Sequence, residues 1–215
     1  MVDLKKYADD GYKEFQSSLI PNLPKEKILG VRIPQLRKIA REFDQKDFHW
    51  ELPHKYYDEY NLHALMINEM TDFNEVISKL QDLLPFVDNW ATCDLIRPKA
   101  GDTRDYLPYI NPWLESDHLY TRRFAIVFHL RNFTGDDYEK NFAIKVLSAP
   151  GDEYYLNMAK GWYLQQLTLN HPEEGLFMMD QVANRDVQKI ARQKIRDSRM
   201  ISQGIKDKLT KSRNL

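Results

Sequence analysis

Hydrophobic positions along the chain recur with the period of an α-helix. Two runs each place their apolar residues on one side of a helix: Tyr56, Tyr60, His63, Ala64 and Ile67, and then Phe73, Val76, Ile77, Leu80 and Leu84. The alternating pattern that is typical of strands is nearly absent. The sequence therefore predicts an all-α protein with about eleven helices, each about 10 to 17 residues long and joined by short links.

Residues that favour helix starts separate these hydrophobic runs. Asp72 and Asp136 each precede a glutamate by three positions, which is the pattern of an N-terminal capping box. Pro34, Pro112 and Pro172 stand where we expect helices to start or break. These signals predict where the helices are bounded.

A weak internal repeat is present in the second half of the chain. Asp117, Asp152 and Asp186 open similar segments at intervals of 35 and 34 residues. This interval is the length of a helical hairpin that stacks on its neighbours. We therefore expect an α-solenoid with a curved, concave face made by the inner helix of each pair. An irregular helical bundle is the alternative.

Length and composition indicate one compact domain, residues 1–215, in a chain of 25.6 kDa with 42% hydrophobic residues. No stretch approaches the roughly 18 apolar residues of a membrane span, and the first six residues lack the apolar core of a secretory signal. We therefore expect a cytoplasmic protein. Cys93 is the only cysteine, which excludes an internal disulfide and a zinc site built from several thiolates. We expect neither a metal nor a cofactor.

Charge is distributed unevenly, although the formal net charge is only −1. From Arg185 onward, through Arg213, there are ten basic and three acidic residues, so this part carries +7 and the remainder carries −8. The near-neutral total argues against a strong polyanion binder, whereas the asymmetry is compatible with a basic face at one end of the molecule. From charge alone, a solvated terminal helix is the simpler interpretation.

The most unusual local sequence spans residues 87–98. We expect Asp88 to cap a helix that begins at about Asn89, which places Trp90 and Asp94 on the same face. An aromatic plane beside a carboxylate suits a sugar that develops positive charge, because the ring packs on the sugar while the anion stabilises the cation. The alternative is a buried tryptophan and a carboxylate that bonds to amides of a neighbouring helix.

A second group of candidate residues follows Asp117, which we expect to cap a helix. Tyr120 and Arg123 then share a face of that helix. Guanidinium groups suit phosphate because their planar fork provides two parallel donors, so either Arg122 or Arg123 can hold a backbone phosphate. Structural arginines that pair with Glu115 or Asp117 are the alternative.

Four short motifs occur in order over most of the chain: Gly30-Val-Arg-Ile-Pro-Gln-Leu-Arg37, Asp88-Asn-Trp-Ala-Thr-Cys-Asp94, Arg122-Arg-Phe-Ala-Ile-Val127 and Ala159-Lys-Gly-Trp162. This ordered set resembles the AlkD-like family of DNA alkylation repair proteins, which are α-solenoids of HEAT-like repeats. Some members are DNA glycosylases. The resemblance implies binding of double-stranded DNA and hydrolysis of the N-glycosidic bond of cationic N3- and N7-alkylated purines, without a deep base pocket.

The resemblance also assigns roles to single residues. Trp90 matches the aromatic residue that packs against the deoxyribose, and Asp94 matches the catalytic carboxylate. Arg123 matches the arginine that clamps a phosphate beside the lesion. Trp162 matches an aromatic residue on the next inner helix, and Tyr120 stands where members can carry an aromatic residue facing DNA. Further DNA contacts are expected from Arg32, Arg122 and Lys160.

Two departures from the family pattern support a second functional hypothesis. We expect one N-terminal helix from about Leu4 to Leu19 that runs into the prolines of residues 21–24, which leaves no room for the second helix that contacts DNA in active members. Gln165 also stands where members often carry a basic residue. The alternative function is therefore an inactive family member that serves as a DNA- or protein-binding scaffold. In either case we expect a monomer.

Overall fold

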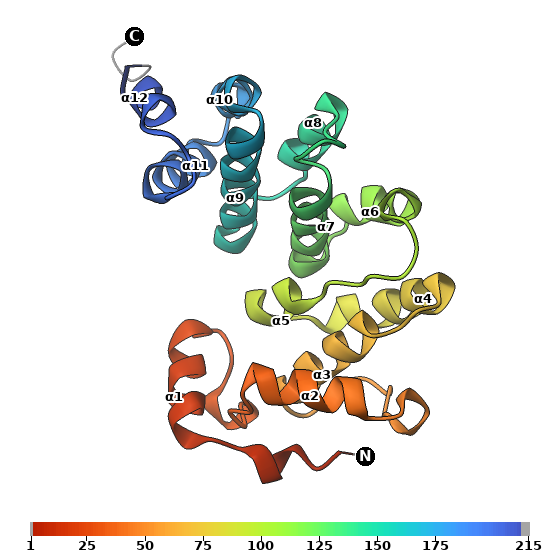
Figure 1. Ribbon diagram of the computed structural model, residues 1–215. Coiled ribbons are helices and arrows are strands. Elements are labelled where there is room, and N and C mark those ends of the chain that lie inside the picture. Colours follow the sequence, from red (N-terminus) through yellow and green to blue (C-terminus); the bar gives the residue numbers. More distant parts are fainter. Residues whose placement is uncertain (1, 212–215) are drawn as a thin grey trace. The chain divides into compact units, whose positions relative to one another are not determined.

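The structure is a computed structural model that describes residues 2–211, and all regular secondary structure in these residues is helical. The predicted all-α class is therefore confirmed, and the helical hairpins are those of an α-solenoid (Figure 1). The described part contains twelve α-helices, and some, such as the six-residue α5, are shorter than predicted. No described helix is both long and apolar enough to cross a membrane.

The chain divides into two compact units, Met1–Asp105 and Tyr106–Leu215. The α-helices of the first unit are α1 Asp10–Leu19, α2 Ile33–Glu42, α3 Tyr57–Asn68, α4 Phe73–Leu83 and α5 Trp90–Leu95. Short 3₁₀ helices accompany them at Leu4–Tyr7, Lys25–Lys27, Gln45–Asp47, Leu84–Phe86 and Thr103–Tyr106.

The N-terminal segment is not the single helix that was predicted from about Leu4 to Leu19. Asp9 has an extended backbone, and its carboxylate accepts a hydrogen bond from the Tyr12 amide at 2.8 Å. Asp9 is therefore the N-cap of α1, which is a separate helix from the 3₁₀ turn Leu4–Tyr7. Residues 2–32 thus contain one α-helix of ten residues.

Helix α3 forms the centre of the first unit and packs against α2, α4 and α5. Its predicted helical conformation is confirmed, but the prediction of a single apolar face is wrong. Almost the whole helix is buried, including the polar side chains of Asp58, Asn61 and Asn68. Helix α4, by contrast, has the predicted one-sided pattern.

Of the two predicted capping boxes, the structure confirms an N-cap for one. The Asp72 carboxylate accepts from the Glu75 amide at 2.8 Å and caps α4 as predicted. Asp136 caps no α-helix, because α8 begins only after Glu139. Pro34 and Pro172 lie in the first turns of α2 and α10. Pro112 lies inside α6 near its C-terminal end and does not break it.

The second unit contains the remaining α-helices: α6 Leu107–Leu114, α7 Leu119–Asn132, α8 Lys140–Ser148, α9 Tyr154–Asn170, α10 Pro172–Gln181, α11 Arg185–Asp197 and α12 Gln203–Lys211. Helix α9 packs against α7, α10 and α11. Within this unit, α7, α9 and α11 follow one another in one layer, and α8, α10 and α12 form a second layer (Figure 1).

The predicted repeat describes this arrangement with one correction. Helices α7 and α9 begin shortly after Asp117 and Asp152, as predicted. Helix α11 begins earlier than its counterparts, so Asp186 lies inside its first turn. Gly161 explains how closely α9 and α11 approach, since a Cβ atom there would lie 2.4 Å from Cγ2 of Ile190.

Candidate functional site

Helix α5 carries both residues of the predicted tryptophan–carboxylate pair. Its cap is Asn89 and not Asp88, because the Asn89 side-chain oxygen accepts from the Thr92 amide at 2.8 Å. Trp90 and Asp94 are four positions apart and so lie one turn apart on the same side. Both are half-buried, whereas Thr92 and Cys93 between them are buried. The pair is therefore partly open to solvent.

The start of α5 is tied to the segment that ends α1. The Trp90 indole N–H donates to the Leu19 carbonyl oxygen at 3.1 Å. The Asn22 side-chain amide donates to the Asp88 carbonyl oxygen at 2.7 Å. The first bond orients the indole, and the second holds the backbone just before the Asn89 cap, while Trp90 stays half-buried.

Two buried asparagines of α3, Asn61 and Asn68, form hydrogen bonds to α5. The Thr92 hydroxyl donates to Oδ1 of Asn61 at 2.8 Å and accepts from Nδ2 of Asn89 at 3.1 Å. At the other end of α5, Nδ2 of Asn68 donates to the Leu95 carbonyl oxygen at 2.9 Å. A six-residue helix has little stability of its own, so this support determines where the tryptophan and the carboxylate stand. The sequence analysis missed both asparagines.

The segment around Gly30 is bound to α3 through its backbone amides. The buried Asp58 carboxylate of α3 accepts from the amides of Leu29 and Val31, each at 2.7 Å. Burial raises the pKa of Asp58, although these hydrogen bonds act in the opposite direction. Arg32 is exposed, and its guanidinium donates to the Asp9 carboxylate at 2.9 Å. This arginine already bonds within the protein.

Helix α7, which carries the predicted arginines, is buried on all sides from Tyr120 to Leu130. Its cap is His118 and not Asp117, because the imidazole Nδ1 accepts from the Thr121 amide at 3.3 Å. The predicted face of Tyr120 and Arg123 is therefore covered: their exposed fractions are 6% and 5%.

Both predicted phosphate-binding arginines bond to residues at the start of α9. Nη2 of Arg122 pairs with the Glu153 carboxylate at 2.5 Å. The alternative of a structural arginine therefore fits Arg122, but its partner is Glu153 and not the predicted Glu115 or Asp117. Nη1 of Arg123 donates to the Tyr155 carbonyl oxygen at 2.5 Å.

The remaining candidates in the second unit differ in exposure. Lys160 is buried, its ammonium donates to the Ala149 carbonyl oxygen at 2.6 Å, and burial lowers its pKa. The Tyr120 ring lies 6.2 Å from that of Tyr155, measured between centroids. Trp162 on α9 is half-buried. Of the aromatic candidates in this unit, Trp162 is therefore the more accessible.

At least three of the ten basic residues after residue 184 are paired with carboxylates of the second unit. The pairs are Lys189–Asp186 at 3.1 Å, Arg192–Asp180 at 3.0 Å, and Lys208 with Glu173. Arg185 and Arg199 are exposed, whereas Arg213 lies outside the described residues. Across residues 2–211, no group of three or more His, Cys, Asp or Glu side chains could hold a metal ion.

Comparison with known proteins identifies a family. The family model described as DNA alkylation repair enzyme matches residues 1–199, a range that includes all the predicted site residues. No curated protein matches the chain.

Proposed function

Because the chain belongs to the DNA alkylation repair enzyme family, we propose that it is a monofunctional DNA glycosylase that acts on cationic N3- and N7-alkylated purines in duplex DNA. The observation that carries the proposal is the position of Trp90 and Asp94, one turn apart and partly exposed on a helix whose other side is buried.

The chemistry requires few groups from the protein. When the C1′–N bond breaks, the cationic base takes the bonding electrons and leaves as a neutral molecule, so no general acid has to protonate it. The sugar is left as an oxocarbenium ion, which the Asp94 carboxylate stabilises while the Trp90 ring packs on the sugar face. Water then adds to C1′ and releases a proton.

Following the family resemblance, we assign the phosphate beside the lesion to Arg123, whose forked guanidinium suits two phosphate oxygens. Arg123 is also buried, so this contact requires its bond to the Tyr155 carbonyl oxygen to break. Arg123→Ala should weaken DNA binding and lower the salt dependence of binding by about one unit of slope. The measurement is the dissociation constant over a series of salt concentrations. DNA contact by Arg122 and Lys160 would require their bonds to Glu153 and Ala149 to break, so their DNA-binding role stays a prediction.

The direct test is release of the free base from duplex DNA that contains 7-methylguanine, with wild type, Asp94→Asn and Asp82→Asn compared. Asp82 is an exposed acid of α4, so its substitution makes the same charge change away from α5. The proposal expects release by wild type and Asp82→Asn, and much slower release by Asp94→Asn. Release no faster than the spontaneous reaction would refute it.

A non-catalytic scaffold is the second candidate function. The observation that favours it is that residues 2–32 contain a single α-helix, α1, and two 3₁₀ turns. The scaffold hypothesis expects salt-sensitive DNA binding without preference for a lesion, and no effect of Asp94→Asn. If the partner is a protein and not DNA, no DNA binding should be seen even at low salt.

A further inference from the structure

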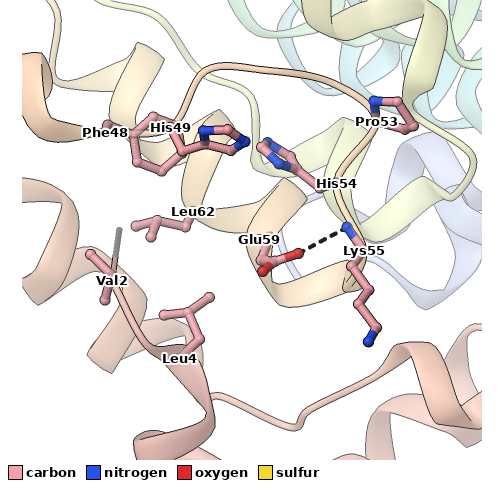
Figure 2. Close-up of a pocket in the computed structure, with 9 residues that line it drawn as sticks. All are labelled: Val2, Leu4, Phe48, His49, Pro53, His54, Lys55, Glu59 and Leu62. Atoms are coloured by element: carbon pink, nitrogen blue, oxygen red, sulfur yellow. Dashed lines mark hydrogen bonds between the residues drawn. The ribbon is translucent and has the colours of Figure 1, made fainter.

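A cavity of about 310 Å³ opens in the first unit beside the N-terminal half of α3. Figure 2 shows its two kinds of wall. Leu4, Phe48 and Leu62 supply an apolar side, and His49, His54 and Glu59 supply a polar side. A cavity of this size holds a molecule with one ring.

Glu59 is held rigidly at the edge of this cavity. One of its carboxylate oxygens, Oε2, accepts from the amides of Lys55 and Tyr56 at 2.9 and 2.8 Å, which forms the capping box of α3. These bonds leave Oε1 without a hydrogen-bond partner among the described residues. Its carboxylate is thus preorganised to accept a donor.

Glu59 also forms no ion pair with any residue that the structure describes. The nearby Lys55 side chain extends away from it (Figure 2), and its ammonium lies 5.2 Å from the centre of the Tyr56 ring. A carboxylate beside an apolar wall is most favourably neutralised by a cation. Lys55 lines the same cavity, but its ammonium lies over the Tyr56 ring, so Glu59 has no ion-pair partner among the described residues.

The histidines beside Glu59 add little positive charge at neutral pH. Nε2 of His54 and Nδ1 of His63 share a hydrogen bond of 2.8 Å. Burial lowers the pKa of His54, and it lowers the pKa of His63 to about 3, so this pair is neutral at pH 7. His49 is exposed and lies 3.8 Å from the Glu51 carboxylate.

We propose that this cavity binds a small organic cation whose charged nitrogen donates to Glu59 and whose apolar or aromatic body packs on Phe48 and Leu62. Charge-assisted hydrogen bonds to a carboxylate are stronger than neutral ones, and the face of an aromatic ring also attracts a cation. The site is separate from Trp90 and Asp94 and does not depend on the proposed glycosylase activity.

The test uses benzylamine as the probe, which is a cation at neutral pH and has one aromatic ring. Benzyl alcohol has a similar shape without the charge, and benzoate carries the opposite charge. Binding to the full-length protein is followed by calorimetry and by NMR shifts of His54 and Phe48. The proposal expects benzylamine to bind at millimolar concentration and benzyl alcohol at least fivefold more weakly. Benzoate should not bind.

Glu59→Gln removes the charge and keeps the capping box, because glutamine also serves at this position. This variant should bind benzylamine at least tenfold more weakly, whereas the matched control Glu42→Gln, at an exposed position of α2, should bind as wild type does. Val2→Trp fills the cavity from the N-terminal segment without altering α3 and should also block binding. Equal binding of benzylamine and benzyl alcohol, no effect of Glu59→Gln, or no benzylamine binding would overturn the proposal.

Discussion

Asn68 and Leu95 join the last turn of α3 to the end of α5 through a hydrogen bond of 2.9 Å from Nδ2 to the Leu95 carbonyl oxygen. The other side-chain atom of Asn68, Oδ1, accepts from the Arg97 amide at 2.5 Å. One asparagine therefore satisfies an acceptor and a donor at the point where α5 ends. Together with the bond between Asn61 and Thr92, this contact fixes the helix that carries Trp90 and Asp94 at both ends.

Replacing Asn68 by leucine should destabilise the first unit. Leucine keeps the number and branching of the side-chain heavy atoms, but the Leu95 carbonyl and the Arg97 amide lose their partners, which costs about 1 to 3 kcal/mol. Urea unfolding measures the loss, and hydrogen exchange should accelerate in residues 90–97. Asn74→Leu, at an exposed position of α4, is the control. Equal stability of Asn68→Leu and wild type would show that this contact does not support α5.

Titration of the buried Asp58 should make the free energy of unfolding depend on pH. Burial raises its folded-state pKa above the ordinary 3.8, so the folded protein holds this proton more tightly than the unfolded chain does. The resulting stabilisation is complete below pH 3.8, falls as the pH rises to the folded-state pKa, and is lost above it.

The measurement for Asp58 is the free energy of unfolding of wild type minus that of Asp58→Asn, from about pH 3.5 to 7. Asparagine does not titrate, so the difference isolates this carboxyl group. We expect the difference to decrease as the pH rises. An increase with pH would mean that the amides of Leu29 and Val31 outweigh burial and lower the pKa.

Gly30 should tolerate no side chain. Its φ angle is +85°, and a Cβ atom would lie 2.3 Å from the Asp9 carbonyl oxygen and 2.8 Å from the Lys13 amide nitrogen. Both contacts are backbone atoms at the start of α1, so Gly30→Ala requires this helix to move. We expect a loss of about 2 kcal/mol or more in thermal or urea unfolding.

Gly135 provides the matched control for Gly30, because no atom lies within 4 Å of a Cβ placed there. Gly135→Ala should change the free energy of unfolding by less than about 1 kcal/mol. A similar effect of both substitutions would contradict the proposed role of the close approach between residue 30 and α1.

The fold class and the family followed from local signals in the sequence. The apolar period of residues 73–84 gives α4, and the Asp72 carboxylate caps it as expected. The four ordered motifs led to the family whose model matches residues 1–199. These features depend on neighbouring residues or on short motifs, which a single sequence contains in full.

Features that depend on contacts distant in the sequence were not predictable. Helix α7, which carries Arg122, packs against α9, and Arg122 pairs there with Glu153, which is 31 residues later in the sequence. Likewise, the roles of Asn61 and Asn68 come from α5, which lies far from α3 in the sequence. Asparagines within an apolar helix were a signal, since buried amides need partners, but their partners could not be named.

The most direct test of the central claim is the single-turnover rate of 7-methylguanine release from duplex DNA, measured for wild type and Asp94→Asn. If the carboxylate stabilises the oxocarbenium ion, its removal should cost about 2 to 4 kcal/mol of transition-state stabilisation, which lowers the rate by about 30- to 1,000-fold. DNA affinity should change little. Equal release by the two proteins would contradict the account.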